Sequence, residues 1–396
     1  MRVLVVAPQP FFVERGTPIA VRLLVEELCG FGYRVDLLTY HEGANVEIEG
    51  MRLFRAGRPP GVDRIPIGIS WKKLVCDLWL IVGLIGRLRQ ERYDVIHAVE
   101  EAIFPAAVLS RWSRSKLVYD MDSSLAEQLT DKWRPLRPLR ALFQAVERWA
   151  VRRSDSILPV CEDLAQKVRL WTDSSRVTVL PDVPVGSVSS NLNAEDLRHG
   201  TEHDALIALY VGNLERYQGI DLMLEGFARA RQIDSMRLVV IGGDNAHIEH
   251  YSDRARLLGI DKRVSFMGAR PIAALGAYLA QADVLVSPRV RGQNTPMKVY
   301  SYMQAARAIL ATDIRSHTQV LDSACAELVA ADSAAVARGF ERLARDAAYR
   351  ARLGQAACAR VEREYSLEAF RRRLLAAYDR LTEASSSNPT GLSARI

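Results

Sequence analysis

The stretch SPRVRGQNTPMKVYSYMQAARAILAT, from Ser287 to Thr312, decides the fold of this 396-residue chain. An apolar run at 284–287 leads into a loop with arginine and glycine, a helical pattern follows, and a second apolar run occupies 308–312. Strand, loop, helix and strand in this succession are typical of a parallel sheet covered by helices on both faces. Ligands of such sheets bind beyond the carboxyl ends of the strands, so this loop is a candidate site.

Basic side chains gather where the helix of this stretch is predicted to begin. Thr295 is expected to be the N-cap and Pro296 the first helical residue, so that free N–H groups and the positive end of the helix dipole face the loop. Arg289 and Arg291 precede this point, and Lys298 lies in the first turn. A lysine there opposes the dipole unless an anion is bound, which favours a diphosphate site over a solvated basic surface.

The pattern of a complete lobe extends outward from this loop. Further apolar runs of strand length at 206–211, 237–241 and 264–267 alternate with helical patterns. Arg216, in the loop GNLERYQG at 212–219, can offer its planar guanidinium to a phosphate, although a solvated surface arginine is equally compatible.

The amino-terminal part of the chain shows the same alternation. RVLVVA at 2–7 and RVDLLTY at 34–40 flank a helical pattern, which indicates a βαβ unit, and Thr17 before a proline is the expected N-cap. Together with Arg15 and Gly16 it forms a helix start that attracts phosphate or sugar hydroxyls, while a tight turn alone would have the same sequence. Further strands are predicted at 94–97, 117–119, 156–159 and 177–180.

These patterns predict an α/β protein of two Rossmann-like lobes whose parallel sheets face each other across a cleft. The predicted parts are an amino-terminal lobe at 1–186, a polar linker at 187–204, a carboxyl-terminal lobe at 205–366, a basic amphipathic helix at 367–382 that can return to the first lobe, and a frayed tail at 383–396.

Composition narrows the class of partner and the compartment. The net charge of +6 favours anionic partners, either nucleotide phosphates or a membrane surface, and the absence of an aromatic-basic motif argues against nucleic acid. The five cysteines lack the paired spacing of a zinc site or a disulfide framework. The first residues also lack the pattern of a signal peptide, so a cytoplasmic protein is expected. LWLIVGLIG at 78–86 is too short to span a membrane and is predicted to be a buried helix.

Four segments together resemble glycosyltransferase family 4, retaining enzymes with the GT-B fold. They are ERGTPIAVRLLVEEL, GNLERYQGIDLMLEGF, GARPIAALGAYLAQADVLVSP and NTPMKVYSYMQAARAILATD, and their order covers nearly the whole chain. The resemblance implies that the amino-terminal lobe receives the acceptor and the carboxyl-terminal lobe binds a nucleotide sugar. It also implies that no metal or cofactor is needed, because basic side chains and helix termini stabilise the leaving diphosphate.

The chain departs from the family's pattern at several donor-site positions. Asn213 and Gln218 stand where an arginine and a lysine are common, and Gln293 and Ser301 stand where two glutamates are common. Ser301 can still hydrogen-bond a ribose hydroxyl. The basic cluster and Arg216 are expected to compensate for the lost cations. The predicted donor-binding residues are Gly212, Asn213, Arg216, Gln218, Gly243, Arg289, Arg291, Asn294, Thr295, Lys298 and Ser301.

Asp122 in YDMDSS occupies the position of a histidine often found in the family. The resemblance then implies that Asp122 acts in general acid-base catalysis or contacts the sugar. His97, Glu100 and Glu101 at a neighbouring strand end are the alternatives. Each residue also has a purely structural explanation, since Asp122 or the glutamates can cap a helix and His97 can be a buried histidine satisfied by backbone.

The leading hypothesis is transfer, with retention, of a hexose-type sugar from a nucleoside diphosphate donor to a glycan, lipid or small-molecule acceptor. The alternatives are a sugar-nucleotide epimerase and a catalytically degenerate GT-B binding or scaffold protein. The basic, tryptophan-bearing stretch at 132–153 can rest on anionic lipid at the inner face of a membrane and present a lipid-linked acceptor, although a solvated helix face is the competing explanation.

Overall fold

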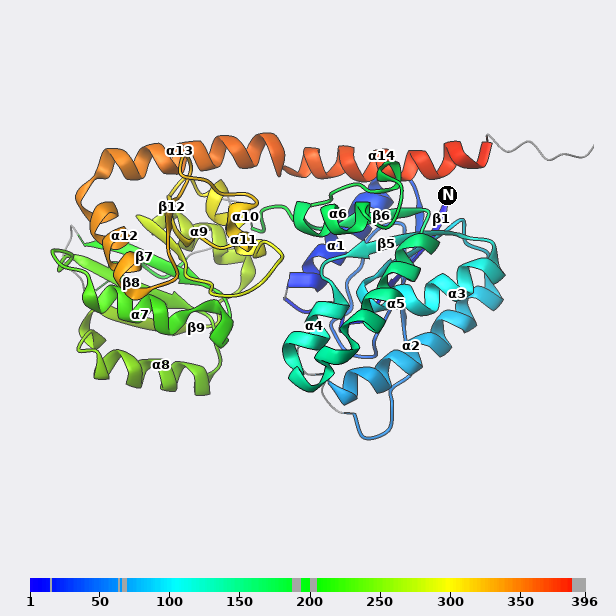
Figure 1. Ribbon diagram of the computed structural model, residues 1–396, viewed down its shortest axis with the longest axis horizontal. Helices are drawn as coiled ribbons and strands as arrows, with labels where there is room; N and C mark the ends of the chain where they lie inside the picture. The colour runs from blue at the N-terminus through cyan, green and yellow to red at the C-terminus, as the bar shows by residue number, and fades with distance from the viewer. Residues whose placement is uncertain (15, 63–64, 66–69, 187–193, 200–204, 387–396) are drawn as a thin grey trace, which may run out of the picture. The chain divides into compact units, whose positions relative to one another are not determined.

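The computed structural model describes residues 1–14, 16–62, 65, 70–186, 194–199 and 205–386. The chain divides into two compact units, which are Met1–Pro181 with Phe370–Ile396, and Asp182–Ala369. Each unit contains one parallel sheet of six strands with helices on its faces (Figure 1). Arg15, predicted to lie in the acceptor or phosphate loop, is outside the described residues, as are 187–193 and 200–204 of the predicted linker.

The amino-terminal unit has the strand order β3-β2-β1-β4-β5-β6. Its strands are β1 (Arg2–Ala7), β2 (Arg34–Thr39), β3 (Met51–Arg55), β4 (Val95–Val99), β5 (Lys116–Met121) and β6 (Ser156–Pro159). Its helices are α1 (Gly16–Gly30), α2 (Trp71–Gln90), η1 (Glu100–Ala102), α3 (Ile103–Ser113), α4 (Leu125–Lys132), η2 (Arg134–Leu139), α5 (Arg140–Arg153), α6 (Glu162–Arg169), η3 (Ser174–Arg176) and most of α14 (Leu367–Ser386).

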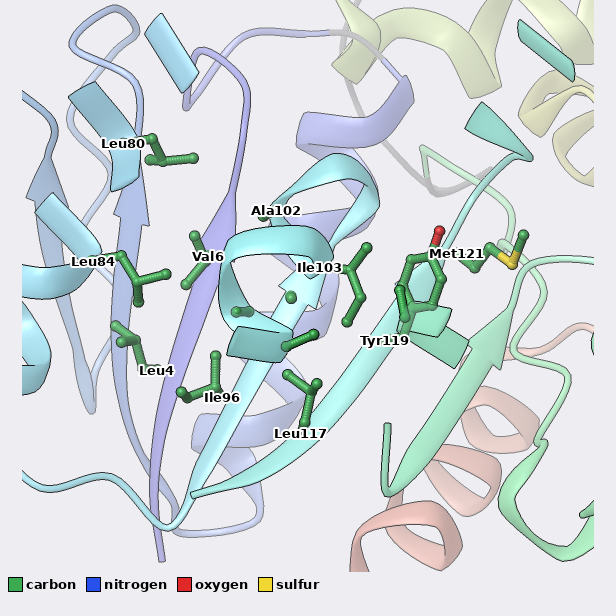
Figure 2. Packing of buried hydrophobic residues seen from close by; sticks show 14 of the residues in the cluster. Leu4, Val6, Leu80, Leu84, Ile96, Ala102, Ile103, Leu117, Tyr119 and Met121 are labelled. Atoms are coloured by element: carbon green, nitrogen blue, oxygen red, sulfur yellow. The ribbon is translucent and has the colours of Figure 1, made fainter. Parts of the chain in front are cut away.

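Alternate residues of β1 pack into layers on opposite faces of this sheet, as the two-residue period of a strand requires. Leu4 and Val6 belong to the core that includes Leu80 and Leu84 of α2, and Figure 2 shows the four side chains between the helix and the strand. Every residue of the strand after Arg2 is buried, which explains why these residues form a continuous apolar run rather than an alternating one.

The carboxyl-terminal unit has the strand order β12-β11-β10-β7-β8-β9. Its strands are β7 (Leu206–Val211), β8 (Met236–Ile241), β9 (Val264–Gly268), β10 (Val284–Ser287), β11 (Ala308–Thr312) and β12 (Glu327–Val329). Its helices are η4 (Arg216–Gln218), α7 (Ile220–Arg229), α8 (Asn245–Leu257), η5 (Asp261–Arg263), η6 (Ile272–Ala274), α9 (Leu275–Gln281), α10 (Met297–Gln304), α11 (Arg315–Thr318), α12 (Ser333–Arg345) and α13 (Ala347–Glu364). Ala208 and Tyr210 of β7 pack into one core, and Ile207 and Leu209 pack into the other.

The prediction that 78–86 forms a buried helix is wrong for one face of α2. Its buried residues recur every four positions, at Cys76, Leu80, Leu84 and Leu88. Exposed apolar side chains occupy the other side: Trp71, Leu74, Leu78 and Val82 are 57% to 69% exposed. Within the described part of the chain, no helix meets the length and apolarity needed to cross a membrane.

Other differences concern the ends of elements. The strand predicted at 177–180 is reduced to an isolated bridge between Val177 and Ile157. Helix α14 continues to Ser386, into the stretch predicted as a frayed tail, and 387–396 lie outside the described residues. The described residues 194–199 of the predicted linker are hydrogen-bonded within the carboxyl-terminal unit, where the Leu197 amide donates to Gln281.

Candidate functional site

Both sheets change direction at one point of their strand order, between β1 and β4 and between β7 and β10. Loops after the two strands that flank such a point diverge and leave room for a ligand beyond the carboxyl ends of the strands. In the carboxyl-terminal unit these are the loops that begin at Gly212 and Pro288. Here the two loops are also joined at one point, by a hydrogen bond from the Val290 amide to the Tyr217 carbonyl at 2.9 Å.

Lys298 is the central cation of this unit's candidate site. It lies in the first turn of α10, with its ammonium nitrogen 3.8 Å from the centre of the Tyr210 ring and 3.4 Å from the amide oxygen of Gln218. No carboxylate among the described residues forms an ion pair with it. Burial, and then repulsion by Arg289, lower the pKa of Lys298 well below its ordinary value. A bound anion would stabilise the charged form of this amine.

Arg289 organises the loop that precedes α10. Its guanidinium donates to the Arg291 carbonyl at 2.7 Å, and to the carbonyl and side-chain oxygens of Asn294 at 3.1 and 3.3 Å. Only 9% of the residue is exposed, and burial lowers its pKa. The predicted cluster therefore combines two roles: Arg289 shapes the loop and adds positive potential, while Lys298 keeps donor capacity for a ligand.

The start of α10 differs in detail from the prediction. Pro296 rather than Thr295 is the N-cap residue, and among the described side chains none caps the helix. The Thr295 hydroxyl is buried without a hydrogen-bond partner in the described structure. A buried hydroxyl without a partner costs free energy, so this corner has unused hydrogen-bonding capacity beside Lys298.

The other predicted donor-site side chains are distributed around this corner. Arg216 and Arg291 are exposed, and no ion pair joins either of them to a described residue. The side-chain oxygen of Asn213 accepts a hydrogen bond from the Glu215 amide at 3.3 Å. Ser301 is buried and exchanges hydrogen bonds with the backbone of Val185, so in this structure its hydroxyl anchors that segment rather than facing solvent.

Glycines allow the strand ends at this site to approach each other closely. The Gly212 amide donates to the Ile241 carbonyl at 3.0 Å, and a Cβ on Gly242 would lie 2.1 Å from the Gly212 carbonyl oxygen. A Cβ on Gly243 would lie 2.5 Å from the Leu214 side chain. The glycine pair is therefore required by packing, and the surface that it leaves is bare backbone.

His317 belongs to this region but was not predicted from the sequence. It is fully buried, its Nε2 lies 2.8 Å from the Ser287 hydroxyl, and its Nδ1 lies 2.8 Å from the Thr312 carbonyl. Burial is the main cause that lowers the pKa of His317 to about 4, and the charges of Lys298 and Arg289 act in the same direction. A neutral histidine thus holds the ends of β10 and β11 together behind the basic cluster.

The pKa of His317 predicts a loss of stability in mild acid. The pKa of about 4 in the folded protein lies below the ordinary histidine value of 6.5, so the unfolded chain takes up the proton first as the pH falls. The free energy of unfolding should therefore be highest above pH 6.5 and decrease by up to about 3 kcal/mol between pH 6.5 and 4. Urea unfolding at several pH values should show that the free energy of unfolding changes less steeply with pH in His317→Gln than in the wild type. The exposed His199→Gln serves as the control, and an unchanged slope in His317→Gln would contradict the assignment.

Carboxylates follow the corresponding strand ends in the amino-terminal unit. Glu100 comes directly after β4 with a φ of +51°, a strained conformation for a residue with a side chain, and it accepts hydrogen bonds from Ser123 at 2.9 and 3.0 Å. Burial, and then the charge of Glu101, raise the pKa of Glu100 to about 8. Glu101 forms an ion pair with Lys73 of α2. Asp122 directly follows β5 and is half-buried, and the N-cap residue of α4 is Ser124 instead.

His97 lies in the middle of β4 and is completely buried. Its Nδ1 is 2.7 Å from the Tyr378 hydroxyl, and its Nε2 is 3.3 Å from the Asp120 carboxylate. The Tyr378 ring also stacks on the imidazole. This matches the structural alternative for His97, with side chains instead of backbone as its partners, and it fixes α14 on this unit.

The predicted acceptor or phosphate loop is described only in part. Helix α1 begins at Gly16, so Thr17 lies inside the helix and is not its N-cap. Gly16 is exposed, and a Cβ there would meet no atom within 4 Å. Close packing of protein therefore does not account for this glycine, and the exposed helix start remains open to a ligand.

Family comparisons match both halves of the chain. Residues 15–182 match the family described as Glycosyl transferase 4-like domain, and residues 205–346 match Glycosyl transferases group 1. The glycogen synthase of Mycobacterium tuberculosis is 24% identical over 63% of this chain and 60% of that protein. A D-inositol 3-phosphate glycosyltransferase of Corynebacterium glutamicum is 27% identical over 47% of this chain and 54% of that protein. The matches to glycogen synthases and D-inositol 3-phosphate glycosyltransferases cover 21% to 60% of the length of those proteins.

Solved structures show the same fold over nearly the whole chain. A sucrose-phosphate synthase from Thermosynechococcus elongatus has a TM-score of 0.77 at 19% identity and covers 97% of this chain and 99% of that one. Anabaena HepE, determined in complex with UDP-glucose, has a TM-score of 0.71 at 13% identity and covers 98% and 100%. The fold is GT-B, as the resemblance implied.

Proposed function

Because the chain belongs to the GT4-type glycosyltransferases, we propose that it transfers a hexose-type sugar, with retention, from a nucleoside diphosphate donor to a glycan, lipid or small-molecule acceptor. The observation that carries the donor assignment is Lys298, a partly buried lysine without an anionic partner among the described residues, beside Arg289 and the uncapped start of α10. The UDP-glucose complex of HepE supports a nucleotide sugar as the ligand of such a fold.

The main requirement of this transfer is that the protein stabilises the leaving diphosphate. The bond between the anomeric carbon and the diphosphate oxygen breaks, the acceptor oxygen bonds to that carbon, and the acceptor proton is released. Lys298, the potential of Arg289 and the positive end of the α10 dipole would stabilise the charge that develops on the diphosphate. Positive charge from the protein supports transfer without a metal or cofactor, and Glu101 or Asp122 would contact the sugar or take the proton.

A thermal-shift screen against UDP-, GDP-, ADP- and dTDP-sugars tests this function, followed by product analysis with the stabilising donor in the presence of EDTA. The proposal requires at least one donor to raise the unfolding temperature and its sugar to appear on an acceptor. Conversion of the donor without any acceptor would indicate an epimerase. If no nucleotide sugar stabilises the protein, a degenerate binding or scaffold protein becomes the better description.

We also propose that the face formed by η2 and α5 rests on an anionic membrane surface. Leu139, Leu142 and Val146 are 41% to 57% exposed there, and the side chain of Arg140 is 56% exposed. Apolar side chains that enter the interface and basic ones that meet anionic headgroups are the two contributions that bind peripheral helices.

This face predicts salt-sensitive binding to vesicles. The protein should float with vesicles that contain phosphatidylglycerol at low salt and dissociate at high salt, because basic residues contribute about 1 kcal/mol each near an anionic surface. Leu142→Ser should weaken the binding several-fold. Leu257→Ser, at an even more exposed apolar residue of the other unit, should not. Equal flotation of both variants, or none of the wild type, would end the membrane proposal.

A further inference from the structure

An apolar cavity of about 280 Å³ lies in the amino-terminal unit among α2, α3, α4 and β1. Its walls include Val6 of β1 and Leu80 and Leu84 of α2, whose side chains Figure 2 shows beside one another. A dry apolar cavity of about 150 Å³ is large enough to take up benzene, so this one can hold a longer hydrocarbon.

The cavity is continuous with the exposed apolar side of α2. Leu74 lines it and is also 57% exposed, so this side chain lies at the mouth. The neighbouring exposed residues on the same side of the helix are Trp71 and Leu78. A hydrocarbon that adsorbs to this exposed stripe therefore meets the cavity at Leu74.

Charged groups occupy one part of the cavity wall. Lys73 and Glu101 both line it and form an ion pair, and Asp77 beside them accepts a hydrogen bond from Tyr40. Glu101 is also a candidate catalytic residue that follows β4, next to the point where the strand order reverses. The cavity thus connects hydrocarbon-lined space to a carboxylate at the predicted acceptor end of the sheet.

We propose that the cavity binds a single aliphatic chain of the acceptor, with the polar head of that acceptor beside Lys73 and Glu101. The inference rests on the proposed transferase function and narrows its acceptor to an amphipathic molecule. Burial of a chain in an apolar cavity favours binding by about fourfold for each methylene group until the space is filled. Affinity should therefore rise with chain length and then level off.

Dodecyl phosphate, below its micelle concentration, is a suitable probe for calorimetry on the full chain. It should bind at least thirtyfold more tightly than butyl phosphate. Leu129→Trp, a change in the α4 wall at a partly exposed residue, should fill the cavity and weaken dodecyl phosphate at least tenfold. Leu78→Ser, on the exposed side of α2 but outside the cavity wall, is the matched control and should bind as the wild type does.

Several results would overturn the proposal. They are equal affinity for the two phosphates, unchanged affinity in a folded Leu129→Trp, or an equal loss in Leu78→Ser, which would indicate adsorption to the surface. The comparison of chain lengths uses the wild type, so it remains decisive even if Leu129→Trp does not fold. Stabilisation by nucleotide sugars should be the same in all variants, since the donor residues lie in the other unit. If no nucleotide sugar stabilises the protein but dodecyl phosphate still binds, the transferase function is refuted and the assignment of the cavity is not.

Discussion

Lys298→Ala is expected to weaken the binding of the nucleoside diphosphate sugar about a hundredfold, because the variant removes one partner of a buried, charge-assisted contact. The free protein should lose little stability. The charged form of Lys298 is already disfavoured by burial and by Arg289, and alanine removes that unfavourable charge. Thermal unfolding without ligand should thus occur at an equal or higher temperature, while the stabilisation by donor is largely lost.

Lys262→Ala provides the control for this experiment. Lys262 is an exposed lysine of the same unit and has no predicted contact with the donor. If Lys298→Ala binds donor as tightly as Lys262→Ala does, the diphosphate does not lie at the start of α10. A large loss of stability in Lys298→Ala without donor would show that the amine serves packing instead of binding.

The basic cluster could be predicted from the sequence because its members are close together along the chain. Arg289, Asn294 and Lys298 fall within one loop and the first turn of the following helix, so local rules predict that they lie close together. The same rules could not show that the Arg289 guanidinium would donate its hydrogen bonds to oxygens of its own loop. His317 could not be found either, because its partner Ser287 is 30 residues away and only the pairing of β10 with β11 brings them together.

The amino-terminal unit shows the same limit over longer distances. The basic helix at the end of the chain was predicted from its period, but its contact between Tyr378 and His97 joins residues 281 positions apart. Helix α2 was also predicted, whereas the exposure of Leu78 on its outer face was not. Periodicity shows that a stretch is helical and apolar, but the neighbours that cover or leave uncovered each face are set by tertiary structure.

The second large expected effect is on stability. Gly242→Ala should lower the free energy of unfolding by about 3–5 kcal/mol, because the residue has a φ of +117° and the new Cβ would lie 2.1 Å from the Gly212 carbonyl oxygen. Gly259→Ala is the matched control: Gly259 also has a positive φ, +69°, but a Cβ there meets no atom within 4 Å, so its cost should be about 1–2 kcal/mol. Urea unfolding of the two variants separates the cost of a positive φ at alanine from the cost of the steric contact that the new Cβ makes. If both lose the same stability, the ends of β7 and β8 can move apart, and the backbone surface assigned to the donor is not fixed by this contact.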